Sequence, residues 1–181
     1  MLVEETYLKD CFVIIPKVHL DSRGYFMESF NQETFNKAIQ NKIVFVQDNE
    51  SKSSKGVLRG LHFQTGAHAQ AKLVRVTQGS VLDVCVDLRE TSPTFGKYFS
   101  VVLDAIQKKQ LFIPRGFGHG FLVLEDHTVF NYKCDNYYNK SAEAGIIYND
   151  KTINIDWGFP REALIFSEKD LQLPTFEKLF K

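Results

Sequence analysis

Short runs in which apolar and polar residues alternate recur along the whole chain, and this period of two constrains the fold more than any other feature. In SVLDVCVDL, at residues 80–88, one face of a strand is apolar and the other carries Asp83, Cys85 and Asp87. The pattern leaves open whether the two aspartates point into the molecule or towards its exterior. Similar short runs occupy residues 11–15, 25–30, 43–47, 56–63, 71–76, 98–103, 110–113, 120–124, 127–134, 146–148 and 153–157. Because turn-forming residues separate these runs, they predict an all-β sandwich or barrel.

The length and composition are those of one folded domain spanning residues 1–181. Hydrophobic residues make up 44% and charged residues 24% of the chain, and no linker or internal repeat divides it. Only two helices are expected. Asn31 is placed to cap a short helix through residues 32–40, with Phe35, Ala38 and Ile39 as its apolar stripe, and Pro174 precedes a terminal helical turn.

The charge and the chain start exclude several classes of protein. Twenty-two basic residues balance 22 acidic ones, and no basic run suits a polyanion, so we expect no nucleic-acid partner. The acidic start has no signal-peptide pattern, and no apolar stretch approaches the roughly 18 residues of a membrane span. We therefore expect a cytoplasmic protein without a membrane partner. Cys11, Cys85 and Cys134 are expected to be reduced and buried.

Polar side chains on inward strand faces indicate a ligand pocket in a sandwich of this kind. Lys72 shares its face with Val74 and Val76, and Tyr132 lies on the same apolar face as Phe130. A lysine or a tyrosine in such a place needs a polar partner or a ligand.

The strand around residues 58–64 presents a conflict of parity. Arg59, His62 and Gln64 are polar groups in an otherwise apolar run, but Arg59 and His62 are three residues apart and would face opposite ways in a regular strand. Gly60 between them predicts a bulge that brings both to one face. An unbroken ladder would remove Arg59 from the site.

The segment PRGFGHGF, at residues 114–121, resembles the second half-motif of the cupin barrels and contains His119. A metal-binding cupin also needs a His-x-His pair and a carboxylate, because these supply the facial ligand set. The matching strand here reads His62-Phe-Gln64, and His68 comes six residues later. We therefore expect no metal site.

Seven runs of the sequence together resemble the dTDP-4-dehydrorhamnose 3,5-epimerases over nearly the whole chain. They are DSRGYFMESF, FVQDNESKSSKGVLRGLHFQ, HAQAKLVRVTQGSVLDVCVDLRETSPTFGKY, LFIPRGFGHGFLVLED, YKCDNYYN, YNDKTINIDW and SEKDLQLP. The resemblance implies a cupin-type jelly roll, a homodimer and no metal or other cofactor. It also implies a dTDP-4-keto-6-deoxyhexose substrate on the way to L-rhamnose.

The resemblance also assigns catalytic roles. His62 matches the family's base, Asp170 the carboxylate that orients it, and Tyr132 the acid on the other face of the sugar. Lys72 matches the cation that stabilises the enolate formed when a proton leaves a carbon next to the C4 carbonyl. An imidazole, whose reference pKa is about 6.5, can accept such a proton near neutral pH.

Substrate contacts carry over by the same resemblance. The matching positions are Arg23, Glu28, Gln47, Asp48, Asn49, Arg59, Lys72, His119, Tyr138, Glu143 and Lys169. Tyr138 matches the residue that stacks on thymine, and in this family Arg23 and Glu28 come from the partner subunit. The dimer is therefore expected to complete the site.

Two alternatives fit the same residues. The nearer one is a relative that inverts only C3 or only C5, or that acts on another nucleotide-4-keto sugar. The more distant one is a non-catalytic cupin that binds a sugar nucleotide. Binding alone needs neither a base nor an acid on the opposite side, so His62 and Tyr132 favour an enzyme.

Overall fold

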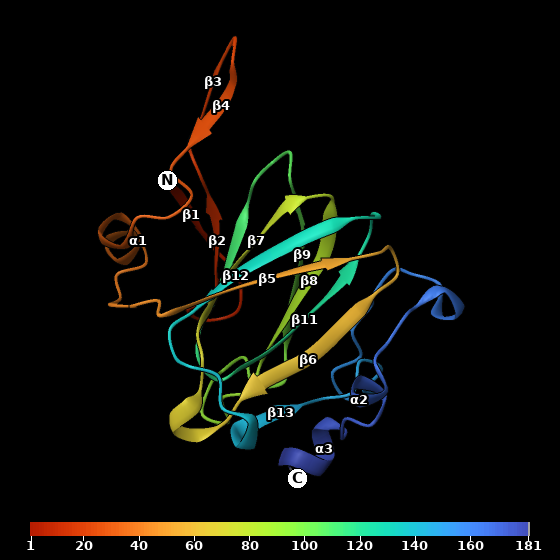
Figure 1. Ribbon diagram of the computed structural model, residues 1–181. Coiled ribbons are helices and arrows are strands. Elements are labelled where there is room, and N and C mark those ends of the chain that lie inside the picture. Colours follow the sequence, from red (N-terminus) through yellow and green to blue (C-terminus); the bar gives the residue numbers. More distant parts are fainter. Residues whose placement is uncertain (181) are drawn as a thin grey trace.

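Two antiparallel sheets face each other in the computed structural model, which describes residues 1–180 (Figure 1). The first sheet has the order β1 (Leu2–Glu5), β2 (Phe12–Ile15), β10 (Gln110–Ile113), β7 (Lys72–Gln78), β12 (Thr128–Cys134), β5 (Gln47–Ser53). The second has the order β13 (Glu143–Gly145), β6 (Leu58–Gln64), β11 (Phe117–Val123), β8 (Ser80–Asp87), β9 (Tyr98–Asp104). The predicted all-β sandwich is confirmed.

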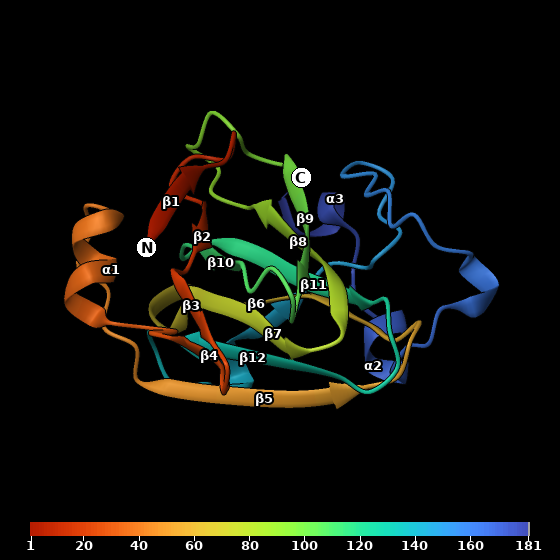
Figure 2. The same cartoon turned by 90° about the horizontal axis from the view of Figure 1, so that it is seen from above.

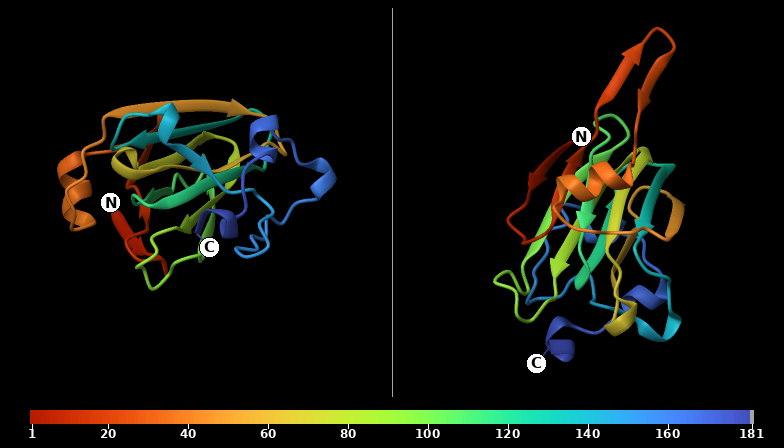
Figure 3. Two further views of the ribbon diagram at one scale, coloured as in Figure 1. Left: turned by 90° about the horizontal axis from the view of Figure 1, so that it is seen from below. Right: turned by 90° about the vertical axis from the view of Figure 1, so that its left-hand side faces the viewer.

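A separate hairpin projects from one end of the sandwich. Its strands β3 (Val18–Asp21) and β4 (Gly24–Met27) pair only with each other. The hairpin extends well beyond the two sheets in two perpendicular views (Figures 1 and 3). Leu20, Tyr25 and Phe26 on this hairpin are 81%, 58% and 71% exposed. One chain therefore leaves an apolar surface on its most prominent projection.

The helices are few and lie outside the sheets. They are α1 (Gln32–Ala38), α2 (Glu168–Leu171) and α3 (Phe176–Phe180), with 3-10 turns at Gly66–His68, Lys140–Ala142 and Arg161–Ala163. The side chain of Asn31 accepts a hydrogen bond from the Thr34 backbone N–H, and Phe35 is buried, so the predicted first helix is confirmed. The predicted turn after Pro174 is α3. Figure 2 shows α1 on one side of the sandwich and α2 and α3 on the other.

Strand β8 is buried on both faces, which explains where its aspartates point. Val81 and Cys85 belong to the core between the sheets, whereas Val84 and Val86 pack against an outer cluster that includes Trp157. Residues 146–180 form much of that outer cluster. Asp83 therefore faces the space between the sheets, because it alternates with the outer residues.

Several strand predictions are wrong. Residues 43–46, 146–148 and 153–157 form no strand, although their apolar side chains pack against buried clusters. Strands β1, β3, β5 and β13 were not predicted. All three cysteines are free and buried, as expected. No helix within residues 1–180 is long and apolar enough to cross a membrane.

Candidate active site

A cavity of about 750 Å³ lies between the two sheets. Strands β5, β7 and β12 line it from the first sheet, and β6 and β11 line it from the second. Residues 165–170, including the first residues of α2, close one side of it. The cavity therefore receives side chains from two opposing walls.

The cavity collects eleven of the fourteen predicted site residues. They are Gln47, Asn49, Arg59, His62, Lys72, His119, Tyr132, Tyr138, Glu143, Lys169 and Asp170. The other three, Arg23, Glu28 and Asp48, do not line it. Asp48 alternates with Gln47 and Asn49 on β5, so it points to the outer face of the sheet, where it pairs with Lys133 at 2.9 Å.

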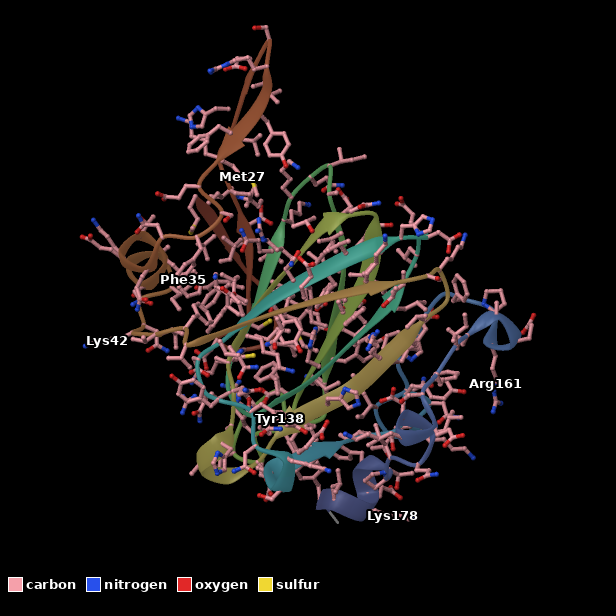
Figure 4. The ribbon with its side chains drawn as sticks, viewed as in Figure 1. Met27, Phe35, Lys42, Tyr138, Arg161 and Lys178 are labelled. Carbon is pink, nitrogen blue, oxygen red and sulfur yellow. The ribbon has the colours of Figure 1, made fainter. Side chains whose placement is uncertain are left out.

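Arg23 and Glu28 lie on or just after the projecting hairpin. The Arg23 side chain is 88% exposed and pairs with Asp21 at 2.6 Å. Glu28 is exposed and accepts a hydrogen bond from Asn31. Met27, the last residue of β4, and Tyr138 at the cavity are labelled far apart in Figure 4. Within one chain these two predicted contacts are remote from the cavity.

The predicted bulge at Gly60 is confirmed. His119 on β11 is opposite His62 on β6, but Phe121 is opposite Arg59, so the register shifts by one residue between them. Gly60 has φ +113°, a region that residues with a Cβ rarely adopt. Because of the shift, Arg59 and His62 both line the cavity.

His62 and Asp170 form the first of two imidazole–carboxylate pairs. His62 Nε2 lies 2.5 Å from Asp170 Oδ1, and the two side chains are 31% and 6% exposed. Ser167 caps α2: its Oγ accepts from the Asp170 backbone N–H and donates to Asp170 Oδ2 at 2.7 Å. Burial alone would raise the pKa of Asp170, but His62 and Ser167 lower it below its usual value. A carboxylate is thus held beside a cavity-facing imidazole.

His119 and Asp83 form the second pair, and it is more deeply buried. His119 Nε2 lies 3.0 Å and 3.2 Å from the two oxygens of Asp83, with the side chains 6% and 0% exposed. Burial lowers the pKa of His119, which Asp83 opposes, and the charges of Lys72 and His62 lower it further. The balance favours the neutral imidazole.

Lys72 and Tyr132 come from the first sheet, and their side chains have no hydrogen-bond partner within residues 1–180. The Lys72 ammonium lies 5.9 Å from the centre of the Tyr132 ring. Burial lowers the pKa of Lys72, against the opposing effects of Cys134, Asp83 and Glu143. Burial also raises the pKa of Tyr132, which keeps the phenol protonated. An ammonium and a phenol are therefore available to a ligand.

Three polar residues form a network at another part of the cavity wall. Tyr138 donates to Glu143 Oε2 at 2.9 Å, and Lys169 Nζ lies 2.6 Å from the same oxygen. Burial alone would raise the pKa of Glu143, but Lys169 and Tyr138 lower it, while Glu143 raises the pKa of both partners. The Tyr138 ring is thereby tethered while remaining 52% exposed.

Two amides on β5 are similarly fixed. Gln47 Nε2 donates to Asn49 Oδ1 at 3.0 Å, and Gln47 Oε1 accepts from the Tyr138 backbone N–H at 3.1 Å. These contacts set the orientation of both side-chain amides, so their remaining donors and acceptors are already positioned for a ligand.

Two residues that support the paired histidines, Ser167 and Asp83, are not among the predicted site residues. Ser167 could have been found from the Ser-x-x-Asp pattern that ends at Asp170, which is typical of a helix start. Asp83 was singled out, but its direction stayed open because both faces of its strand are flanked by buried residues.

The polar groups of the cavity do not form a metal-ligand set. Within the described chain, no three His, Cys, Asp or Glu side chains are grouped so that they could hold a metal ion. The arrangement instead offers an imidazole with its carboxylate, an ammonium and a phenol, which suit proton transfer next to a carbonyl.

Comparison with known proteins identifies the family to which this cavity belongs. The sequence profile of the dTDP-4-dehydrorhamnose 3,5-epimerase family matches residues 5–178. The dTDP-4-dehydrorhamnose 3,5-epimerase of Shigella flexneri is 53% identical, over 97% of this chain and 96% of its own.

Solved structures give the same result. The crystal structure of dTDP-4-dehydrorhamnose 3,5-epimerase from Elizabethkingia anophelis has a TM-score of 0.94 and 52% identity, covering 97% of this chain and 96% of that chain. The Legionella pneumophila dTDP-6-deoxy-D-glucose-3,5-epimerase, solved with dTDP-4-keto-L-rhamnose, has a TM-score of 0.93 and 41% identity, covering 99% and 94%. The fold is thus the cupin-type jelly roll, and this chain is an isomerase that belongs to the dTDP-4-dehydrorhamnose 3,5-epimerase family.

Proposed function

We propose that this chain inverts C3 and C5 of dTDP-4-dehydro-6-deoxy-D-glucose to give dTDP-4-dehydro-L-rhamnose, in dTDP-L-rhamnose biosynthesis. The observation that carries the proposal is that His62 and Tyr132 face one cavity from opposite sheets. Inversion requires a proton to leave one face of a carbon and another to arrive from the opposite face. Two groups on opposing walls meet that requirement.

The reaction begins with His62 as the base. Its imidazole takes the proton from a carbon next to the C4 carbonyl, and the electron pair moves to the carbonyl oxygen to form an enolate. Asp170, 2.5 Å away, stabilises the resulting imidazolium. At C5 the phenol of Tyr132 then donates a proton from the other side, and at C3 a solvent water donates it from that side. Proton exchange with solvent then returns His62 and Tyr132 to their starting states.

The enolate oxygen needs a positive partner in the cavity. Lys72 is suited to this role because its ammonium lines the cavity and is free of hydrogen bonds within residues 1–180. A donor that is already in place when charge develops lowers the barrier by about 3 to 4 kcal/mol. Arg59, also on the cavity wall, adds a second cation.

The nucleotide is proposed to bind near Tyr138. The tethered ring offers a face for thymine, and Lys169, Gln47 and Asn49 offer donors to the diphosphate and sugar. This placement directs the hexose towards His62 and Tyr132.

We further propose that the active form is a homodimer in which the hairpin of one protomer completes the cavity of the other. Two features support it: the exposed Leu20, Tyr25 and Phe26, and the distance of Arg23 and Glu28 from their own cavity. A projecting apolar hairpin is a suitable element for an isologous exchange between two copies.

The function is tested by incubating the protein with dTDP-4-dehydro-6-deoxyglucose in deuterated water and following the C3 and C5 protons by NMR. We expect deuterium at both carbons and conversion to the L-sugar. Exchange at one carbon only would select a single-site epimerase, and no exchange would refute the substrate assignment. A parallel sample with a chelator tests the expectation that no metal takes part.

The dimer is tested by mixing two variants, Arg23→Ala and His62→Ala, after reversible unfolding together. One of the two cavities in a mixed dimer would have both His62 and an intact partner hairpin. Random pairing should then restore about a quarter of the wild-type rate at low substrate concentration. A rate equal to the sum of the separate variants would rule out the shared site.

A further inference from the structure

Asp83 is a fully buried carboxylate for which the proposed reaction has no stated use. It lies on β8 between the sheets, with 0% exposure. Within residues 1–180, its hydrogen-bonding partner is His119 Nε2, which lies close to both carboxylate oxygens. A buried carboxylate with one imidazole donor requires a positive charge nearby, because desolvation penalises an unbalanced ion.

The contact fixes which nitrogen of His119 carries a proton. An ionised carboxylate only accepts hydrogen bonds, so Nε2 must donate. While the ring is neutral, Nδ1 then has a lone pair and accepts a hydrogen bond. Since His119 lines the cavity, the ring is suited to accept from a sugar hydroxyl rather than to act as a second cation.

Lys72 lines the same cavity as His119, has no ion-pair partner within residues 1–180 and is acted on by the charge of Asp83. The titratable or charged groups that act on Lys72 or line the cavity come from both sheets and from α2. They are Glu50 on β5, Cys134 and Tyr132 on β12, Asp83 on β8, His119 on β11, His62 and Arg59 on β6, Glu143 on β13, Lys169 and Asp170 on α2, and Tyr138. Glu143 pairs with Lys169 at 2.6 Å, Asp170 pairs with His62 at 2.5 Å, and Glu50 accepts a hydrogen bond from Asn131. Cys134 has its pKa raised to about 11, so its thiol is neutral at pH 7. Asp83 is therefore the negative charge left to balance Lys72.

We propose that Asp83 is a positioning residue, which fixes His119 as the Nε2–H tautomer and supplies the buried negative charge that keeps Lys72 protonated. The consequence for the reaction rests on the proposed function. Without Asp83, Lys72 would lose its charge at lower pH, and the enolate would lose its cation.

The test uses Asp83→Asn, which keeps the shape and removes the charge. Its matched control is Asp87→Asn, because Asp87 lies on the same face of β8, is equally buried and is held outside the cavity by Arg89, Ser92 and Thr94. We expect kcat of Asp83→Asn to fall about tenfold or more. Its alkaline limb should move to lower pH by about one unit, whereas the control should keep the wild-type profile.

Two readouts are independent of turnover. In the wild-type protein, nitrogen-15 NMR of labelled histidine should show His119 with its proton on Nε2. Carbon-13 NMR of labelled lysine, with the Lys72 signal identified by Lys72→Met, should show a lower pKa in Asp83→Asn than in wild type.

The outcomes separate this inference from the function. A wild-type His119 with its proton on Nδ1, or an unchanged Lys72 pKa in Asp83→Asn, would overturn the role of Asp83 even in an active enzyme. The expected NMR results in a protein that leaves dTDP-4-dehydro-6-deoxyglucose unchanged would support Asp83 and refute the substrate instead. The wild-type tautomer needs no variant, so the inference stays testable if Asp83→Asn does not fold.

Discussion

The cavity contains two imidazole–carboxylate pairs on adjacent strands, and their surroundings differ. His62 and His119 are direct cross-strand neighbours. The His62 side chain is 31% exposed and its carboxylate comes from α2 near the chain end. The His119 side chain is 6% exposed and its carboxylate comes from the central strand β8. Both imidazoles thus line the cavity, but the carboxylate of His62 comes from its rim whereas that of His119 is buried between the sheets.

This difference shows how burial assigns a role. A base must reach the substrate and carry a charge for part of the cycle, which requires an accessible imidazole and a nearby carboxylate. His62 satisfies both conditions. His119 is held where desolvation disfavours the imidazolium, so it is suited to bind as a neutral group.

The largest expected effect separates the two histidines directly. His62→Ala should abolish deuterium exchange at both C3 and C5, a loss of about 10³-fold, because no other group takes the proton. His119→Ala should retain exchange at a rate reduced by about tenfold, since it removes a substrate contact and the partner of Asp83 but leaves the base in place. Both rates are measured by NMR in deuterated water.

The control for these variants is His127→Asn in an exposed turn, where φ is +60° and asparagine is tolerated. Its exchange rates should equal those of the wild type. Equal losses in His62→Ala and His119→Ala would end the distinction drawn between the two pairs.

The second effect concerns the opposite wall. Tyr132→Phe removes the phenol from β12 and should leave exchange at C3 while inversion at C5 falls by about 10²-fold. Tyr137→Phe, at an exposed tyrosine outside the cavity, is the matched control. Product analysis by NMR distinguishes the two carbons, and full inversion at C5 in Tyr132→Phe would show that the proton comes from another group.

The sandwich was predictable where one face of a strand is buried and the other is not. The strand β12 followed from its alternation, and Tyr132 lies on the face shared with Phe130. β5 was missed because QDNESKS is polar on both faces: one lines the cavity and the other is exposed. The apolar pattern of residues 153–157 predicted a strand, but these side chains cover the outside of the second sheet. That position requires buried side chains and no backbone pairing.

The residues of the site were mostly predictable from the sequence, but the residues that hold them in place were less so. The resemblance identified eleven residues that one chain brings to one cavity. It also named Arg23, Glu28 and Asp48, which one chain leaves outside the cavity; Asp48 alternates with Gln47 and Asn49 and so points to the outer face of the sheet. Asp83 shows the remaining limit: alternation gives the face of a strand but not which face is covered by later residues.

The third prediction changes the carboxylate of the exposed pair. Asp170→Asn should lower kcat by about 10²-fold or more, because the amide cannot stabilise the imidazolium of His62. Glu168→Gln removes a charge from the same helix at an exposed site and should have little effect. A normal rate in Asp170→Asn would contradict the pairing as a catalytic feature.

The lowered pKa of Asp170 also predicts that the stability of the fold depends on pH. Its folded pKa is lowered, so its ionisation stabilises the fold above the unfolded pKa, and this contribution is lost as pH falls through the folded value. The free energy of unfolding of Asp170→Asn, measured with urea, should therefore vary less with pH below about pH 4 than that of wild type. An identical acid dependence in both proteins would contradict it.

The smallest effect tests how the exposed pair is held. Ser167→Ala removes both contacts of the hydroxyl with Asp170, so the carboxylate gains freedom and the rate should fall by about threefold to tenfold. Ser167→Thr keeps the hydroxyl and should restore most of the rate, which a purely steric role would not predict. Ser141→Ala, which loses a hydroxyl contact with Asn139 outside the cavity, is the control. The carboxylate that pairs with His119 lies on a central strand and needs no such support. A rate in Ser167→Ala equal to that of wild type would mean that α2 holds Asp170 without its cap.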